Sequence, residues 1–486
     1  MTKRVIAALC VLALVLSIAP MLVVSVYSHP FYDDFGFTLA PRAVWRETGS
    51  VWETLGAGLA AAHSERYTWQ GAYTTNYLTD ISPFIRSEGQ YFWTTLALLA
   101  ALLGGVFALA FAACRTLLGA GRAEATAVGA MAAFLMTQFA PEPSEAFFWA
   151  NGGYNYALIT ALTLLSLARA IHLLKAESAR DVIGWCAALL LPLTLSGGGS
   201  YAPGLFAVCA FGLLTLWALL TRQKRRWPLC AATLWLLACF LYNCLAPGNA
   251  VRAGTLTGGM SPVKAVAQAF YFGFALMGRF FSLPLLAALL VTALLLLPAL
   301  RRTQLRFSHP LLWTAALACL FCAQLAPTLY TGNYLGDGRA VDTYWFTYVA
   351  LSFTLCVYWL GWAAKRLPKK AEESRVRPLP LLVAAALLAV GCVGYRPENA
   401  ESYGPQNMTG GSALRSLLSG EAAEYDRQMD AREAALNDPA QPEVELRPIT
   451  GIPKVFMSDA LESGMRSYVL ELYRDYYGKT AVTAKE

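Results

Sequence analysis

The sequence predicts an all-α protein that crosses a membrane about eleven times and ends in a small α/β domain. Three observations predict this class. Hydrophobic residues make up 57% of the 486 residues and charged residues only 14%, as in polytopic membrane proteins. Apolar runs of spanning length recur along the chain. Lys and Arg gather in alternate loops, which accounts for the net charge of +7 without a nucleic-acid partner.

The first apolar run, residues 5–27, follows Lys3 and Arg4. It is longer than the core of a signal peptide, so we interpret it as an uncleaved first span. Ten further runs of spanning or near-spanning length lie at 92–114, 123–140, 154–174, 182–197, 203–221, 228–246, 281–300, 311–327, 344–364 and 379–396. Residues 264–281 form either an extra span or a helix lying in the membrane interface.

The loops between these runs alternate in charge. The basic set holds Lys3/Arg4, Arg115/Arg122, Lys175/Arg180, Arg222/Lys224/Arg225/Arg226, Arg301/Arg302/Arg306 and Lys365/Arg366/Lys369/Lys370/Arg375/Arg377. The opposite loops are longer and carry fewer basic residues. Because basic loops stay in the cytoplasm, we expect a multi-pass cell-membrane protein with a cytoplasmic N-terminus. The membrane domain would cover residues 1–396, and residues 397–486 would form an extracytoplasmic domain.

Two of the expected outer segments have internal structure. The first outside loop, residues 28–91, contains an amphipathic pattern at 44–62 that predicts one helix on the membrane surface. In the C-terminal domain, residues 411–436 are helix-prone and 443–457 contain short Val/Ile/Phe runs typical of strands. Residues 459–478 predict an amphipathic helix with Gly478 as its C-terminal cap.

Asp33 and Asp34 are the leading catalytic candidates, because they lie where the first span leaves the bilayer. A positioned carboxylate can remove a proton from a hydroxyl group, and partial burial raises its pKa toward a useful range. Adjacent side chains generally point apart, so one should face a substrate and the other take a structural or metal role. The alternative is a loop whose aspartates cap backbone groups or pair with Arg.

The second candidate group lies in the outside loop at 141–156. Carboxylate, amide and aromatic groups together suit a sugar, which offers hydroxyls and an apolar face. The alternative is a turn that caps the next helix, which fits Glu142 better than Glu145. The candidates are Glu145 for catalysis and Trp149, Asn151 and Tyr154 for binding.

Arg252 and Arg339 lie in outside loops, where positive charge is otherwise sparse. Arg binds phosphate in a bidentate manner, so both are candidates for a phosphate-bearing substrate. The alternative is a salt bridge to Asp337, Asp342 or a lipid headgroup.

His63, Arg66, Trp69 and Tyr73 share one face if their segment is helical, and they would line an acceptor groove. A surface helix that meets lipid headgroups is the alternative. His29 precedes Pro30 and fits a turn residue better than a metal ligand. With four His in the chain, no classical zinc site is visible.

Several motifs together resemble a bacterial multi-spanning family of unknown function that is labelled glucosyltransferase-like and is similar in layout to the GT-C class and to O-antigen glucosyltransferases. They are Tyr32-Asp-Asp-Phe35, Trp149 with Asn151-Gly-Gly-Tyr154, Leu245-Ala-Pro-Gly-Asn249 with Arg252, Gly338-Arg-Ala340 and Tyr476-Tyr-Gly478. The resemblance implies a polyprenyl-phosphate sugar donor and transfer at the outer face. It implies a base or metal role for Asp33 or Asp34, a phosphate role for Arg252 or Arg339, and a place for Asn249 in the substrate site.

The interpretation that follows is an inverting, GT-C-like hexosyltransferase that moves a sugar from a polyprenyl-phosphate donor to a glycan, lipid or protein acceptor of the cell envelope. Membrane lipid is its other partner. Metal use is left open, with Mg²⁺ or Mn²⁺ as the candidate ions. Two alternatives remain: a transporter or flippase for lipid-linked saccharides, which would show inverted repeats and a site at mid-membrane, and a non-catalytic envelope assembly protein.

Overall fold

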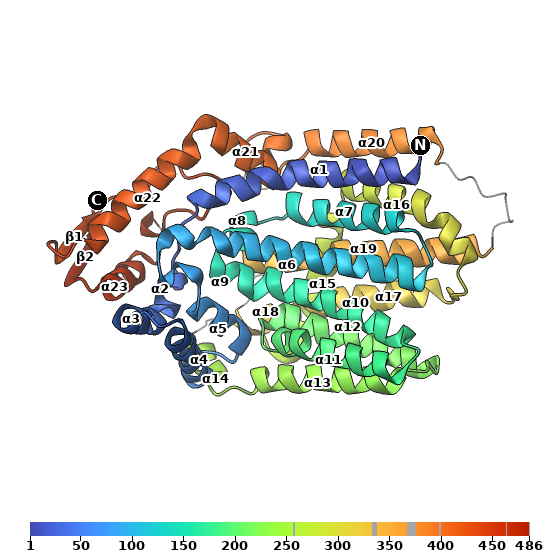
Figure 1. The fold of residues 1–486 in the computed structure, drawn as a ribbon, viewed down its shortest axis with the longest axis horizontal. Coiled ribbons are helices and arrows are strands. Elements are labelled where there is room, and N and C mark those ends of the chain that lie inside the picture. The colour runs from blue at the N-terminus through green and yellow to red at the C-terminus, as the bar shows by residue number, and fades with distance from the viewer. Residues whose placement is uncertain (256–257, 333–337, 367–375, 398–399, 463, 486) are drawn as a thin grey trace.

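The structure is a computed structural model that describes residues 1–486 except 256–257, 333–337, 367–375, 398–399, 463 and 486 (Figure 1). The described residues are overwhelmingly helical and contain one two-stranded sheet. Four residues named in the sequence analysis lie outside the described residues: Asp337, an alternative salt-bridge partner, and Lys369, Lys370 and Arg375 of a basic loop.

Long helices run side by side through the body of the molecule (Figure 1). They are α1 (Lys3–Val24), α6 (Phe92–Phe111), α7 (Arg122–Gln138), α10 (Ile159–Lys175), α11 (Ala179–Gly197), α12 (Tyr201–Leu220), α13 (Arg226–Cys244), α15 (Pro262–Phe280), α16 (Leu283–Arg302), α17 (Pro310–Ala323), α19 (Arg339–Ala364) and α20 (Pro378–Val393). Within the described ranges, nine helical segments are long and apolar enough to cross a membrane, which confirms a helical polytopic architecture.

The two other expected spans form shorter helices. The run at 123–140 gives α7 with 17 residues, and the run at 379–396 gives α20 with 16 residues. Both still pack in the bundle, α7 against α1 and α20 against α16. The segment at 264–281 is helical as α15 and packs against α17 and α18 (Ala326–Thr331).

One end of the bundle collects the basic loops, and we call it the basic end. Lys3 Nζ lies 2.7 Å from Glu124 Oε1, which joins the start of α1 to the start of α7. Lys365 Nζ donates to the Arg301 carbonyl at 3.3 Å, which joins the ends of α19 and α16. The N-terminus lies at this end too (Figure 1). The loops that the charge pattern grouped together therefore meet in space.

The opposite end, which we call the site end, holds the folded segment 28–91 (Figure 1). It forms α2 (Asp33–Phe37), α3 (Leu39–Thr48), α4 (Val51–Thr68) and α5 (Tyr73–Asp80). The single helix expected at 44–62 is wrong. Gly49 ends α3 in the left-handed conformation with φ +62°, and the Ser50 hydroxyl then accepts from the Glu53 amide to begin α4.

The C-terminal elements lie against the site end and along α1 (Figure 1). They are α21 (Thr409–Ser419), α22 (Glu421–Asn437), β1 (Glu443–Leu446), α23 (Arg466–Tyr477) and β2 (Ala481–Ala484). The helix expected at 411–436 breaks at Gly420, which has φ +78°. Strands β1 and β2 pair in parallel, with Glu443 opposite Ala481. Gly478 caps α23 as expected, with φ +68°.

Helix α21 joins the C-terminal region to the membrane bundle. The Gly410 amide donates to Gln138 Oε1 at 2.9 Å, and Ala413 shares a buried apolar cluster with Leu14 and Met21 of α1. A Cβ atom on Gly410 would lie 2.1 Å from the Ser17 carbonyl oxygen, so only glycine permits this approach. The C-terminal region is thus packed onto the bundle.

Gly410→Ala should lower the stability of the full-length protein by about 1–3 kcal/mol, because the added methyl group forces α21 away from α1. Thermal unfolding in detergent micelles measures the effect. Gly184→Ala is the matched control: Gly184 lies in α11 with nothing within 4 Å of the added Cβ, so its stability should be unchanged or slightly higher. Equal stability of the two variants would contradict the close packing.

Candidate functional site

The Asp33–Asp34 turn is held in a strained conformation. Tyr32, the residue before α2, has φ +55°, a region that side chains with a Cβ rarely adopt. Asp34 stabilises this turn because its Oδ2 accepts from the Phe31 amide at 3.1 Å. The Trp149 indole also donates to the Phe31 carbonyl at 3.1 Å. Such strain persists only where the surroundings enforce it, and it often marks a functional site.

Asp34 is completely buried and surrounded by donors. Its Oδ2 accepts from the Tyr91 hydroxyl at 2.5 Å, and its Oδ1 accepts from the backbone N–H of Asn151 at 3.2 Å. Tyr91 in turn accepts from the Ala150 amide at 2.8 Å. Burial raises the pKa of Asp34 to about 7, and the donors oppose that rise. Since both oxygens already face N–H and O–H groups, the site is built for a carboxylate and poorly suited to a metal ion.

Asp33 points the other way and is partly exposed. Its Oδ2 accepts from Asn151 Nδ2 at 2.9 Å, and the hydroxyl of Tyr468 also bonds to it. Burial raises the pKa of Asp33, while the guanidinium groups of Arg339 and Arg252 lower it; the net direction is upward. The two aspartates therefore differ as expected for adjacent residues: Asp34 is completely buried, and Asp33 is partly exposed and lies near two arginines.

Asn151 contacts both aspartates, and its own orientation is controlled by the helix that carries it. It lies in α9 (Ala150–Gly153), one turn before Asn155, whose Nδ2 donates to Asn151 Oδ1 at 2.7 Å. That bond turns the Asn151 amide so that its Nδ2 faces Asp33. Gly152 allows α9 to lie tightly against α8 (Pro143–Phe147), because a Cβ there would be 2.4 Å from the Glu145 carbonyl oxygen.

Arg339 reaches this site from the start of α19. Its guanidinium carbon lies 4.8 Å from the centre of the Trp149 ring, a cation–π contact, and its charge acts on Asp33. Glu145 Oε2 accepts from the Arg339 amide at 2.7 Å and so caps α19. Asp342 is buried and accepts from the Glu142 amide at 3.0 Å. The structure thus gives Glu145 a positioning contact; its catalytic role stays a prediction.

Arg252 and Asn249 lie together in α14 (Gly248–Thr255) and have different surroundings. Asn249 Oδ1 accepts from the Gly71 amide at 2.9 Å and from the Tyr201 hydroxyl, and its Nδ2 donates to the Asn243 carbonyl at 2.9 Å. These bonds occupy Asn249 in joining α14 to the bundle. Arg252 lies 5.1 Å from the centre of the Trp69 ring, and its charge reaches Asp33.

The expected acceptor face of His63, Arg66, Trp69 and Tyr73 is wrong as a single helical face. Helix α4 ends at Thr68, and Tyr73 begins α5. Arg66 packs 3.6 Å from the Tyr242 ring centre and donates to the Tyr242 carbonyl at 2.6 Å. Tyr73 donates to the Thr194 carbonyl at 2.7 Å. His63 is exposed, and Trp69 contacts Arg252, a candidate phosphate-binding residue.

Residues from five distant segments therefore meet around Asp33. These residues are Asp33 and Asp34, Trp149 and Asn151, Arg252, Arg339, and Tyr468 of α23. Tyr154, which follows Asn151 by less than one turn, is buried behind them in a cluster with Phe35 and Tyr91.

A cavity of about 460 Å³ opens at the same end of the molecule. It is lined among others by Arg42, Arg46, Arg86 and Glu433, and Asp33 is not part of its lining.

Tyr91 and Tyr468 are site residues that the sequence analysis missed. Tyr91 lies at the end of the first outside loop, directly before an apolar run. Tyr468 lies on an amphipathic helix far along the chain, and its ring centre is 5.7 Å from that of Tyr32. Neither position carries a local signal of its contact with an aspartate, because both contacts depend on tertiary packing.

Comparison with known proteins found no matching family model, no matching curated protein and no matching solved structure.

The raised pKa of Asp34 has a measurable consequence for stability. The folded state holds this proton more tightly than the unfolded chain, so the resulting stabilisation is present at acid pH and is lost as the pH rises through about 7. Asp34→Asn removes the titrating carboxyl group, so the stability of the variant lacks this dependence on pH. The difference in melting temperature, wild type minus variant, should therefore be largest near pH 4 and fall toward about pH 8. A series of thermal melts in detergent measures it, with the exposed Asp475→Asn as matched control. A difference that grows with pH would contradict the assignment.

Proposed function

We propose that this chain is a membrane glycosyltransferase that takes its sugar from a polyprenyl-phosphate donor and transfers it at the site end of the bundle. The observation that carries the proposal is the placement of one partly exposed carboxylate, Asp33, within the electrostatic reach of two arginines from separate segments, Arg252 and Arg339. A base and two cations in one place match a reaction that removes a proton from an acceptor and releases a phosphate.

In the proposed reaction the Asp33 carboxylate takes the proton of an acceptor hydroxyl. The acceptor oxygen forms a bond to the anomeric carbon of the sugar, and the bond from that carbon to the phosphate oxygen breaks. The leaving polyprenyl phosphate keeps the electron pair. Arg252 and Arg339 stabilise its charge, and the configuration at the anomeric carbon inverts. The protein supplies position and charge, and the leaving phosphate needs no protonation.

The surroundings of the two aspartates support Asp33 as the base and Asp34 as a positioning residue. Asp33 is only partly exposed, and its burial raises its pKa, as a base that works near neutral pH requires. Asp34 has no accessible surface and accepts three hydrogen bonds. Trp149 and Asn151 are both buried; Trp149 packs against Arg339 and Asn151 donates to Asp33, so they support the proposal by positioning the cation and the base.

The location of the site favours a transferase over a transporter of lipid-linked saccharides. A transporter of this kind binds its substrate near the middle of the membrane, between broken helices. Here the charged cluster lies at one end of the bundle, in α2, α14 and the start of α19 (Figure 1). The basic loops gather at the opposite end, which by the positive-inside rule supports an extracytoplasmic location of the cluster.

Asp33→Asn should lower sugar transfer at least about a hundredfold, because the amide cannot accept the acceptor proton. Two measurements check this. The first is the sugar composition of envelope glycans in cells that lack the gene and carry either variant. The second is loss of label from radiolabelled polyprenyl-phosphate hexoses added to the purified protein with envelope extract. Asp475→Asn, an exposed change on α23, is the matched control. Wild-type transfer by a folded Asp33→Asn protein would contradict the base assignment.

Arg339→Lys and Arg252→Lys keep the charge and lose the two-pronged donor geometry, so each should raise KM for the donor about tenfold and lower kcat. KM for the acceptor should stay near the wild-type value, which separates a phosphate contact from general damage to the fold. Arg427→Lys on α22, where the native side chain pairs with Glu424 at the surface, serves as the control. An unchanged donor KM in both variants would show that the phosphate binds elsewhere.

A further inference from the structure

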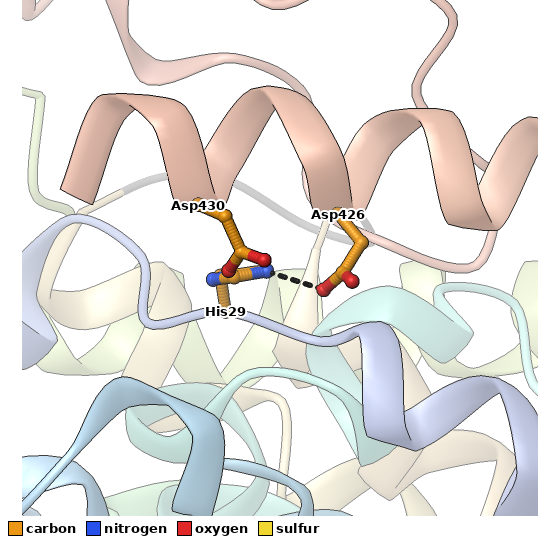
Figure 2. A group of neighbouring side chains, drawn as sticks. All are labelled: His29, Asp426 and Asp430. Carbon is orange, nitrogen blue, oxygen red and sulfur yellow. Dashed lines mark hydrogen bonds and ion pairs between the residues drawn. The ribbon is translucent and has the colours of Figure 1, made fainter. Parts of the chain in front are cut away.

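A second group of ionisable side chains joins the first outer segment to the C-terminal region (Figure 2). His29 Nε2 lies 2.9 Å from Asp426 Oδ1, although the two residues are 397 positions apart. Asp430 follows Asp426 by one helical turn on the same face of α22, and Figure 2 shows both carboxylates beside the imidazole. One ligand atom from each of the three residues lies within 4.8 Å of the others.

The imidazole is held as a metal-binding histidine commonly is. The His29 side chain is only 4% exposed, and its Nδ1 makes no hydrogen bond within the described part of the chain. Nδ1 lies 4.0 Å from Glu88 Oε2, and the other oxygen of Glu88 accepts from the Tyr477 hydroxyl. A metal-bound histidine usually directs its second ring nitrogen at a carboxylate, which fixes the tautomer and orients the ring. Glu88 is the carboxyl group beside Nδ1 and would have to move closer to accept a hydrogen bond from it.

The balance of charge around His29 is negative. Asp430 and Glu433 lie close enough to repel Glu88 electrostatically, and Arg42 and Arg432 act on it with the opposite sign. Two arginines of α22 form ion pairs with carboxylates other than Asp426 and Asp430. Arg427 pairs with Glu424 at 2.6 Å, and Arg432 pairs with Asp459 at 3.0 Å in a buried salt bridge. Several carboxylates that converge on one imidazole repel each other unless a cation lies among them.

We propose that His29, Asp426 and Asp430 bind a divalent transition-metal ion, with Zn²⁺ and Mn²⁺ as the best-matched ions. One imidazole nitrogen and two carboxylate oxygens suit these ions, whereas Ca²⁺ and Mg²⁺ prefer sites made of oxygen alone. Nε2 is the nitrogen that faces the carboxylates, so it is the ligand, and Nδ1 carries the proton toward Glu88. The ion has a structural task and lies outside the Asp33 site.

The position of the ion explains what it does for the protein. His29 lies four residues before Asp33 in the sequence, and α22 belongs to the same C-terminal region as Tyr468, which bonds to Asp33. An ion held between the two segments fastens the C-terminal region over the first outer segment. The inference concerns binding and docking, so it stands whether or not the chain transfers sugars.

Metal binding by the full-length protein in detergent tests the proposal directly. The protein is stripped with EDTA, dialysed against Zn²⁺, Mn²⁺, Ca²⁺ or Mg²⁺ alone, and its metal content is measured by mass spectrometry. We expect about one Zn²⁺ or Mn²⁺ per chain and at least tenfold weaker binding in Asp426→Asn and Asp430→Asn. Glu424→Gln, an exposed change on the same helix, is the matched control and should bind as the wild type does.

A second readout keeps the test decisive if a variant is less stable. Zn²⁺ should raise the melting temperature of the wild type and of Glu424→Gln, because an ion that binds only the folded state stabilises it. It should leave Asp430→Asn unchanged, and that exposed substitution should not disturb folding in the absence of metal. No bound transition metal in the wild type would overturn the proposal. Equal binding by wild type and both aspartate variants would also overturn it, because the ion would then lie elsewhere.

Discussion

Burial of the Asp34 carboxylate is the constraint on which the rest of the site depends. A carboxylate with no access to water is tolerated only where donors replace its hydration. Here those donors come from three segments: the Phe31 amide, the Tyr91 hydroxyl and the Asn151 amide. Each donor is therefore fixed relative to the others. The strained Tyr32, the start of α6 and the start of α9 are held in one arrangement because a single side chain requires all three.

This arrangement makes Asp33 accessible and directs charge toward it. Asp34 occupies the buried position of α2, and the side chain of its neighbour Asp33 is partly exposed. The cations that reach Asp33 are themselves held by aromatic rings, Arg339 by Trp149 and Arg252 by Trp69. A ring orients a guanidinium group without neutralising it, unlike a carboxylate partner. The ring contacts thus restrict the positions of both arginines near Asp33.

The sequence was informative where a pattern is local or periodic. Apolar length predicted the long helices, and the alternation of Lys and Arg grouped loops that do meet at one end. The same alternation of basic and non-basic loops grouped the segments of Asp33, Asn151, Arg252 and Arg339 at the other end, although these segments are far apart in the sequence. The break between α3 and α4 was visible in Gly49-Ser50, a helix stop followed by an N-cap, and was overlooked in favour of hydrophobic spacing.

The contacts that escaped prediction are those that only tertiary packing decides. Nothing near Tyr468 or His29 in the sequence shows that one bonds to Asp33 and the other to Asp426. Both contacts join the C-terminal region to the segment that follows α1, and they lie on either side of Tyr32. Site geometry at Asp33 is therefore coupled to the docking of a region that begins only at residue 397. Loss of that docking would remove Tyr468 and expose Asp33 to water, which would lower its pKa toward that of an ordinary carboxyl group and weaken it as a base.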